Sequence, residues 1–373
     1  MKPARILVVD DELGMLRAVE RVLSDEYHVT TTPLPGDALK LAEELLPDLA
    51  IVDIRMPELD GFELMTRLKA RVPGIDVILM TGSVDDLDDK LVRALRSEAF
   101  YFIQKPFDRN VFRTLVERCI ELRSRREDHR RHLQHLETEM AQARAFQESL
   151  LPEPEATIGR VAVCCRYRPC SALGGDLCDY ADAGGGRIAL LVADVSGHGV
   201  SAAMLTGIVK SAFQASHADG FEPAAVVQRV STGLAACSPE RFVTLIAALI
   251  SPDDGRLEYV NAGHPPLAVW GTGCQPLWLE STGPLISPVL MPSIWEARTV
   301  SIAEGDRILM YTDGVSETLA GEDGSGAEAR FAIAIARAAS GAALLDAILA
   351  DVEGALGGQP QPDDLTLLTA SYL

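Results

Sequence analysis

The feature that most constrains this chain is a run of residues, 111–150, that contains neither glycine nor proline. The run is polar and rich in Arg, Glu, Gln and His, and Pro152 and Pro154 follow it. This composition predicts one long helix that ends before the prolines. At 373 residues the chain is too long for one ordinary domain. We therefore expect a domain at 1–122, a helical linker at 111–150 and a second domain at 151–373.

Spacings of four and three along this helix mark a seam in which eight of eleven residues are apolar. The seam residues are Leu115, Cys119, Leu122, Arg126, His129, Leu133, Leu136, Met140, Ala143, Gln147 and Leu150. Such a seam favours a coiled coil and a parallel homodimer, and the alternative is one helix that packs its stripe on its own domain. His129, His132 and His135 recur every third residue, which is more typical of a solvated helical face than of a metal site.

Residues 1–122 alternate short β-like runs with amphipathic stretches such as Leu13–Leu23 and Gly61–Ala70. The predicted strands are Arg5–Val9, His28–Thr32, Leu49–Val52, Asp76–Met80 and Tyr101–Gln104. Alternation of this kind indicates an α/β domain with a parallel sheet covered by helices on both faces. The functional groups of such a sheet cluster beyond the carboxyl ends of its strands.

Residues 151–373 contain many predicted strands and few helices. The strands are Val161–Tyr167, Ile188–Ala193, Phe242–Ile250, Leu257–Val260, Leu267–Trp270, Arg307–Tyr311 and Leu365–Ala370. The helices are Val200–Ser216, Pro223–Ala236 and Ala342–Leu356.

The composition restricts the partners and the location of the protein. A formal charge of −20 disfavours binding to nucleic acid or to an anionic membrane. The start of the chain cannot be a signal peptide, and no apolar run approaches the ~18 residues of a membrane span. We expect a cytoplasmic protein with seven reduced cysteines. Among them, Cys164, Cys165 and Cys170 are interpreted as small core residues.

Five residues of the first domain predict an acidic pocket at one edge of its sheet. Asp10 and Asp11 follow the first strand, Asp53 the third and Thr81 the fourth, and Lys105 follows the fifth. Carboxylates this crowded repel one another unless a divalent cation joins them. Asp53 can then act as a nucleophile toward a phosphoryl group, whose charge Lys105 can offset.

The segments VVDDE, VDIRMPELDGFEL, MTG and QKPF resemble the receiver domain of two-component response regulators, which has a flavodoxin-like, doubly wound fold. The resemblance implies that Asp53 accepts phosphate from a histidine kinase. It implies that Mg²⁺ is held by Asp11, Asp53 and the carbonyl of Arg55, with Asp10 assisting, and that Thr81, Phe102 and Lys105 form the switch. The chain departs from this family at residues 97–99, which should affect only a turn.

Four separated sites in the last segment place carboxylates at strand ends beside residues that allow tight turns. They are Asp176 and Asp179 after Gly-Gly, Asp194 before SGHG, Asp313 before a glycine, and the pair Asp363 and Asp364. Hard oxygen ligands of this kind suit Mg²⁺ or Mn²⁺. Two such ions about 3.5–4 Å apart can share a water and direct it at a phosphorus atom.

This set of aspartates, with AFQESLLP and YVNAGHPP, resembles the PPM (PP2C-type) serine/threonine phosphatases, in particular the bacterial branch that regulates sigma factors. The resemblance implies an α/β-β/α sandwich over residues 151–373. It implies that Asp194 bridges two Mn²⁺ or Mg²⁺ ions. The other implied ligands are the Val195 carbonyl, Asp313, Asp363 and Asp176, with Asp179 and Asp364 in support. The segment at 319–330 departs from the family, where substrate selection is expected to vary.

Two histidines, His198 and His264, lie in motif loops of the last segment. Either could protonate a leaving serine oxygen, or could hold its loop in place by hydrogen bonds. Neither is assigned as an acid.

Together these patterns predict a response regulator that dephosphorylates phosphoserine or phosphothreonine on a protein. The family resemblance makes an anti-sigma-factor antagonist of the STAS type the best substrate candidate. The alternative is a non-catalytic adaptor that binds a sigma or anti-sigma factor through a phosphatase-like fold. Loss of the metal aspartates would mark the adaptor, and all four sites are present here.

Overall fold

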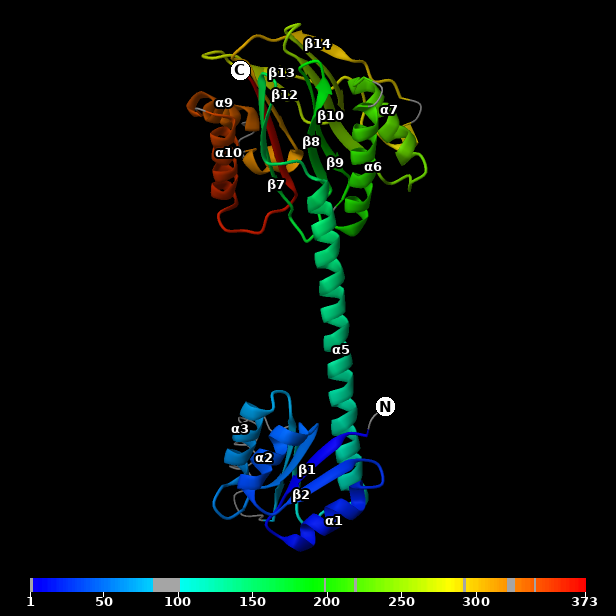
Figure 1. Ribbon diagram of the computed structural model, residues 1–373, viewed down its shortest axis with the longest axis vertical. Coiled ribbons are helices and arrows are strands. Elements are labelled where there is room, and N and C mark those ends of the chain that lie inside the picture. Colours follow the sequence, from blue (N-terminus) through cyan, green and yellow to red (C-terminus); the bar gives the residue numbers. More distant parts are fainter. Residues whose placement is uncertain are drawn as a thin grey trace. The chain divides into compact units, whose positions relative to one another are not determined.

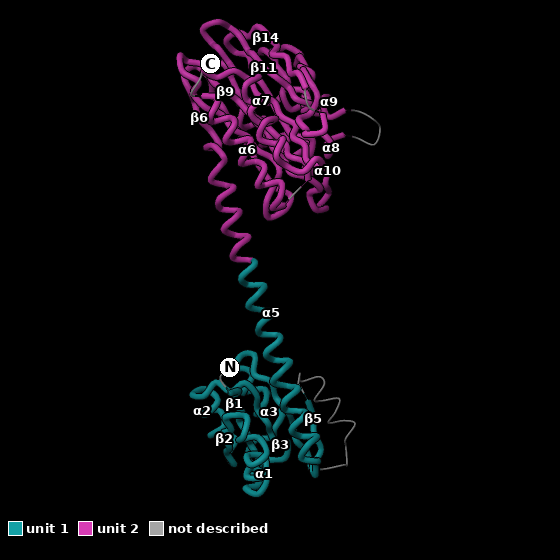
Figure 2. The backbone as a smooth tube through the Cα atoms, turned by 90° about the vertical axis from the view of Figure 1, so that its right-hand side faces the viewer, with its two compact units in different colours: residues 1–136 teal, residues 137–373 magenta. Residues whose placement is uncertain are grey.

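The computed structural model describes residues 3–82, 101–197, 199–217, 220–290, 293–320, 326–338 and 340–373. The chain forms two compact units, residues 1–136 and 137–373, which Figure 2 shows in different colours. Three predicted features lie outside the described residues: the departure at 97–99, the loop histidine His198, and part of the divergent segment at 319–330.

The first unit is built on a five-stranded parallel sheet with the order β2-β1-β3-β4-β5 (Figure 1). Its strands are β1 (Arg5–Val9), β2 (His28–Thr32), β3 (Leu49–Asp53), β4 (Asp76–Thr81) and β5 (Tyr101–Gln104). Its helices are α1 (Leu13–Leu23), α2 (Pro35–Leu45), α3 (Gly61–Arg71) and the start of α5 (Arg109–Leu150). Helices α2 and α3 pack on one face, and α1 and α5 on the other. The predicted doubly wound fold is confirmed.

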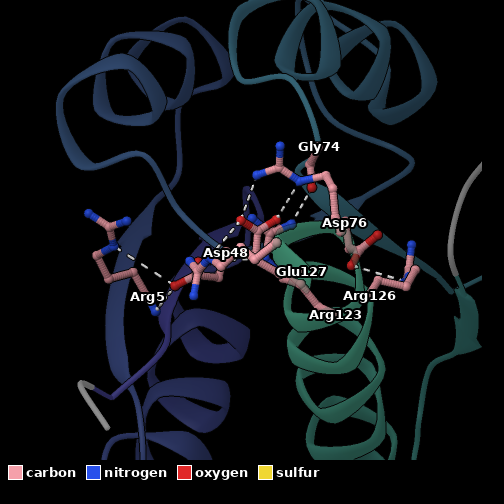
Figure 3. Close-up of polar contacts among 9 residues, drawn as sticks. Arg5, Asp48, Gly74, Asp76, Arg123, Arg126 and Glu127 are labelled. Carbon is pink, nitrogen blue, oxygen red and sulfur yellow. Dashed lines mark hydrogen bonds and ion pairs between the residues drawn. The ribbon is translucent and has the colours of Figure 1, made fainter. Parts of the chain in front are cut away.

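Arginines tie the start of α5 to the amino edge of this sheet, as Figure 3 shows. Arg123 Nε lies 3.5 Å from Asp48 Oδ1, and Arg126 Nη2 lies 3.4 Å from Asp76 Oδ2. Burial raises the pKa of Asp76, and the positive charges of Arg126 and Arg123 offset part of that rise. The contact lies at the edge opposite the predicted phosphoacceptor, so it holds the helix without covering that residue.

The seam of α5 is buried at its start and open further along. Leu115 and Cys119 pack against the core of the first unit. Leu133 and Leu136 are 46% and 42% exposed in the single chain. The packing interpretation therefore holds for the first turns of the helix, and the coiled coil along its exposed middle stays a prediction.

The second unit consists of two antiparallel sheets packed face to face. One sheet has the order β14-β11-β10-β9-β8, and the other β13-β12-β15-β16-β7-β6. The strands are β6 (Glu155–Ile158), β7 (Val161–Arg168), β8 (Asp176–Gly184), β9 (Arg187–Val195), β10 (Val243–Ser251), β11 (Arg256–Ala262), β12 (Leu267–Trp270), β13 (Leu277–Leu279), β14 (Arg298–Ser301), β15 (Arg307–Tyr311) and β16 (Leu365–Tyr372). Apolar side chains from both inner faces form one core between the sheets.

Helices cover the outer face of each sheet, which confirms the predicted α/β-β/α sandwich. Helices α6 and α7 pack on the first sheet, and α8, α9 and α10 on the second. Their bounds are α6 (Val200–His217), α7 (Pro223–Leu234), α8 (Asp313–Leu319), α9 (Ala327–Arg337) and α10 (Gly341–Leu356). Across the part of the chain that the structure describes, every helix is too short or too polar to cross a lipid bilayer.

Two elements that position the site are not among the predicted ones. Strand β8 carries acids at Asp176, Asp179 and Asp182, which interrupt the apolar pattern that marks a strand. Helix α8 begins at Asp313, where the Asp-Gly pair is equally compatible with a turn.

His264 lies in the loop after β11 and is enclosed, with 4% of its surface exposed. Its Nδ1 lies 2.7 Å from Thr244 Oγ1, and its backbone N–H donates to Asn261 Oδ1 at 2.8 Å. Burial lowers the pKa of His264 to about 3. A neutral imidazole closed off from solvent cannot protonate a leaving group, so His264 holds its loop in place.

We expect His264 to make the second unit about 2 kcal/mol less stable at pH 5 than at pH 7.5. The unfolded chain takes up a proton below the ordinary histidine pKa of 6.5, whereas the folded chain does so only near pH 3. Stability therefore falls as the pH falls between these two values. Trp270, Trp278 and Trp295 all lie in this unit, so tryptophan fluorescence during urea unfolding with a chelator reports on it. His264→Gln should remove this part of the pH dependence, and an unchanged dependence would contradict a buried neutral histidine.

Candidate functional site

The carboxyl edge of the first unit's sheet brings together three predicted residues. Asp10 follows β1 and Asp53 ends β3, and their exposures are 0% and 4%. Lys105 follows β5, and its Nζ lies 2.6 Å from Asp10 Oδ2 and 2.6 Å from Asp53 Oδ1. They meet because parallel strands end at the same edge of a sheet.

The charges of this pocket are unbalanced. Burial raises the pKa of Asp10, and the hydrogen bond from Lys105 offsets part of the rise. Burial alone would lower the pKa of Lys105, but its hydrogen bonds to Asp10 and Asp53 raise it above the ordinary value. Two carboxylates therefore face one ammonium, and Asp11, which is exposed, adds a third negative charge at this edge. The oxygen donors fit a hard divalent cation such as Mg²⁺.

The remaining predicted receiver residues lie on the segments around the pocket. The backbone N–H of Arg55 donates to Asp53 Oδ2 at 2.8 Å. Thr81 is fully buried at the end of β4, and Phe102 is half-buried on β5. Gly61 begins α3 so close to the pocket that a Cβ there would lie 2.2 Å from the carbonyl oxygen of Asp53. Only glycine allows this approach.

In the second unit, Asp176 and Asp194 lie directly opposite each other on β8 and β9. Asp176 is buried, and its Oδ2 accepts hydrogen bonds from Thr312 Oγ1 at 2.8 Å and Thr366 Oγ1 at 2.6 Å. Thr312 precedes α8 and Thr366 lies on β16, so both hydroxyls come from the other sheet and its helix. Asp176 thus joins the two layers at one end of the sandwich and is held in one orientation.

Asp194 faces a concentration of negative charge. Burial, and then the charges of Asp313, Asp363, Asp364 and Glu317, raise its pKa to about 7. Burial and the charges of Asp363 and Glu317 raise the pKa of Asp313 as well. Carboxylates that raise one another's pKa lie near each other with too little positive charge between them.

The two neighbouring aspartates before β16 have different surroundings. Asp363 is exposed. Asp364 is buried and accepts hydrogen bonds from the backbone N–H groups of Cys170, at 2.7 Å, and Gly175, at 2.5 Å. Asp364 therefore holds the loop before β8, while the carboxylate of Asp363 is open to a ligand.

Cys170 corrects the interpretation of the cysteines as core residues. Cys165 is buried in the core between the sheets, and Cys164 packs against the core of the second sheet. Cys170 instead lies at the carboxylates, and its Sγ and oxygens of Asp363 and Asp364 lie within 4.8 Å of one another. Among the residues that the structure describes, no other three such ligands come as close together. Burial, with the charges of Asp364 and Asp363, raises the pKa of the Cys170 thiol to about 11.

Two glycines are required by the close approach of the backbone at this end of the sandwich. A Cβ at Gly175 would lie 2.6 Å from the carbonyl oxygen of Val195, and one at Gly314 would lie 2.2 Å from that of Asp364. The oxygen donors on β8, β9, α8 and the start of β16 therefore lie at the same end of the sandwich. Oxygen atoms of this kind are the hard ligands that Mg²⁺ and Mn²⁺ prefer.

Glu317 and Gln147 are absent from the predicted site. Glu317 lies one turn after Asp313 on α8, and this spacing of four is the signal that could have found it. Gln147 is 7% exposed near the end of α5. Its Nε2 donates to the Gly174 carbonyl at 2.6 Å, and its Oε1 accepts from the Gly174 N–H at 3.1 Å. Gln147 could have been found from the sequence as a polar residue within a largely apolar seam.

Asp179, predicted as a supporting residue, has a different partner from the other aspartates. Its Oδ2 lies 2.7 Å from Lys210 Nζ on α6, and both side chains are largely buried. Burial raises the pKa of Asp179, and the hydrogen bond from Lys210 offsets part of that rise. This pair fixes α6 against β8, three residues after Asp176.

Comparisons with known proteins agree with this division of the chain. Residues 6–117 match the response regulator receiver domain model, and residues 184–373 match the model described as Stage II sporulation protein E (SpoIIE). Phosphoserine phosphatase RsbP of Bacillus subtilis is 32% identical over 189 residues, 49% of this chain and 46% of RsbP. The transcriptional regulatory protein GlrR of Escherichia coli is 33% identical over 123 residues, 32% of this chain and 27% of GlrR. The chain thus spans less than half the length of these curated relatives.

Solved structures share the fold of the second unit. The PP2C domain of SiaA from Pseudomonas aeruginosa matches with a TM-score of 0.56 and 22% identity, over 65% of this chain and 98% of that one. The RsbU and RsbW domains of Rv1364c from Mycobacterium tuberculosis match with a TM-score of 0.50 and 27% identity, over 58% of this chain and 62% of that one. The SpoIIE match alone spans more than half of the chain. The chain therefore belongs to the SpoIIE family, and a response regulator receiver domain precedes its PP2C-type phosphatase domain.

Proposed function

We propose that this protein is a response regulator whose output is metal-dependent dephosphorylation of phosphoserine or phosphothreonine on a protein. The observation that carries the proposal is the group of carboxylates around Asp194, whose pKa is raised to about 7. The likeness to RsbP, which is named a phosphoserine phosphatase, supports the same reaction. The functional segments of the proposal are a receiver at 1–122, a helical linker at 111–150 and a phosphatase at 151–373.

Oxygen donors at this end of the sandwich would hold two Mn²⁺ or Mg²⁺ ions: Asp176, Asp194, Asp313, Asp363 and the Val195 carbonyl. Such ions lower the pKa of a water between them and offset the charge of the phosphoryl oxygens. The water would lose a proton to solvent as its oxygen bonds to phosphorus, the bond from phosphorus to the serine oxygen would break, and the serine oxygen would take up a proton. We assign this proton to solvent, because His264 is enclosed and neutral.

Phosphorylation of Asp53 by a histidine kinase would control this output. The bond from phosphorus to the kinase imidazole breaks, and a bond to the Asp53 carboxylate forms. Asp10, Asp11, Asp53 and the Arg55 carbonyl would hold Mg²⁺ beside it. Lys105, which now bridges Asp10 and Asp53, would offset the added charge, with Thr81 and Phe102 as the switch residues.

The linker helix is the proposed route from receiver to phosphatase. Gln147 on α5 holds both polar groups of Gly174, and the next residue, Gly175, donates to Asp364. A movement of the helix would therefore act on the loop that leads into Asp176. We further propose a parallel homodimer through the exposed seam, and a STAS-type anti-sigma-factor antagonist as the substrate.

A non-catalytic adaptor that binds a sigma or anti-sigma factor is the alternative. An adaptor has no use for crowded carboxylates that repel one another, since their repulsion lowers stability unless a cation joins them. The presence of Asp176, Asp194, Asp313 and Asp363 therefore favours the enzyme.

The proposal predicts that Asp194→Asn lowers kcat/KM by more than the roughly 100-fold that loss of an outer metal partner costs. The substrates are p-nitrophenyl phosphate and a phosphoserine STAS protein, with Mn²⁺, with and without acetyl phosphate. Asp182→Asn changes an exposed aspartate of the same sheet and should leave the rate unaltered. Asp53→Asn should abolish the response to acetyl phosphate. Equal inactivity of wild type and Asp194→Asn on both substrates would support the adaptor instead.

Replacing Gln147 by leucine should remove the response to acetyl phosphate while the receiver is still phosphorylated. Leucine has a similar volume but cannot make either hydrogen bond to Gly174. Gln142→Leu is the matched control, because Gln142 is exposed on the same helix. Phosphatase rates and phosphoryl incorporation at Asp53 are measured in parallel. A normal response in Gln147→Leu would show that this contact does not transmit the signal.

Light scattering should give a mass about twice the 40.1 kDa of one chain for the wild type. Leu136→Glu places a charge in the seam and should shift the protein to the monomer, since a buried charge in a coiled coil is costly. Gln142→Glu adds the same charge outside the seam and should remain dimeric. A monomeric wild type at micromolar concentration would refute the proposed dimer.

A further inference from the structure

Between β9 and α6, directly after Asp194 and Val195, the structure describes Ser196, Gly197 and Gly199, which are called the turn below. Gly197 and Gly199 adopt positive φ angles of 86° and 78°, which other residues rarely adopt. With these two glycines, the backbone of the turn is not fixed by its own conformational preferences. Its position, and with it the position of the oxygen donors before it, must come from contacts with neighbouring segments.

One side of the turn rests on the loop before β8. The N–H of Val195 donates to the Gly175 carbonyl at 3.2 Å, and the N–H of Gly199 donates to the Leu173 carbonyl at 3.1 Å. These backbone bonds fix the ends of the turn on that side. They leave the peptide groups at Ser196 to be held from the other side.

The start of β10 holds those peptide groups. The N–H of Ser196 donates to the Phe242 carbonyl at 2.9 Å, and the Phe242 N–H donates to Ser196 Oγ at 3.0 Å. In a trans peptide the N–H and the preceding C=O point in opposite directions. The bond to Phe242 therefore turns the Val195 carbonyl away from β10, toward the side where it lies 2.6 Å from the Cβ position of Gly175.

Arg241 adds two side-chain hydrogen bonds to these contacts. Its Nη1 donates to the Ser196 carbonyl at 2.7 Å, and its Nη2 donates to Ser201 Oγ at 2.7 Å. One planar guanidinium thus joins the start of the turn to the first turn of α6, which the single ammonium of lysine cannot do. Gly197 allows the approach, because a Cβ there would lie 3.1 Å from Arg241 Nη1.

The partners of Arg241 distinguish it from a surface ion pair. Within the described part of the chain, no carboxylate lies at ion-pair distance from Arg241, although the protein has 54 acidic residues. Both of its hydrogen bonds go to neutral oxygens of the turn and of α6. A charged donor makes a stronger hydrogen bond to such an oxygen than a neutral donor does.

We propose that Arg241 is a positioning residue of the phosphatase, which sets the Val195 carbonyl and the Asp194 carboxylate for divalent cations through its hydrogen bonds to Ser196 and Ser201. This inference rests on the proposed function, because it takes Asp194 and the Val195 carbonyl as the metal ligands proposed there. Arg241 itself touches neither the cations nor the substrate.

The test is Mn²⁺ binding by calorimetry to the full chain carrying Asp53→Asn, which removes a receiver carboxylate from the measurement. Arg241→Gln should weaken Mn²⁺ binding about tenfold, the lower end of what outer-shell changes cost. Arg241→Lys should restore only part of the affinity, and Ser201→Ala should weaken it less than Arg241→Gln does. Tryptophan fluorescence of the metal-free variants measures stability separately.

Arg187→Gln is the matched control. Arg187 begins the same strand β9 and likewise donates to turn carbonyls, those of Gly184 and Ala183, at the opposite end. It should lose similar stability and keep wild-type Mn²⁺ affinity. Unchanged affinity in Arg241→Gln, or an equal loss in Arg187→Gln, would overturn the positioning role. If Arg241→Gln does not fold, Ser201→Ala decides, and unchanged affinity there also overturns it. A wild type that binds no Mn²⁺ would overturn the proposed function itself.

Discussion

Repulsion among carboxylates at one end of the sandwich is the constraint on which the phosphatase unit depends. Asp176, Asp194 and Asp313 come from β8, β9 and α8, and burial is the first cause of the raised pKa of each. Neutral donors hold them: threonine hydroxyls on Asp176, and backbone amides on the neighbouring Asp364. These donors orient the oxygens without cancelling the charge, which a cation is left to do.

The receiver meets the same constraint in another way. Lys105 lies 2.6 Å from both Asp10 and Asp53, so a built-in ammonium already offsets part of the negative charge. In the phosphatase unit the ammonium of Lys210 pairs with Asp179, and among the described residues no ion pair reaches Asp176, Asp194 or Asp313. The two units therefore offset crowded aspartate charge in different ways, with a lysine in the receiver and with neutral hydrogen-bond donors in the phosphatase unit.

A functional residue can be found from the sequence when it interrupts a regular pattern of apolar residues. Much of the receiver fold and both central aspartates could be predicted in this way. Asp53 and Asp194 end apolar strands, where an acid is conspicuous. Strand β8 was missed because Asp179 is tolerated inside it only through Lys210, a partner that appears once α6 is folded. Arg241 lies in an ordinary polar segment, and only the fold brings it to Ser196.

The pairing of Gln147 with Gly174 has a consequence for chemical ageing. The side-chain amide imitates a peptide group, since it offers one donor and one acceptor to the two polar groups of a single residue. Deamidation to glutamate would leave the acceptor in place and turn the donor into a second acceptor facing the Gly174 carbonyl. The loss of one nitrogen would thus convert an attraction into a repulsion, at the point where the linker helix meets the loop leading to Asp176.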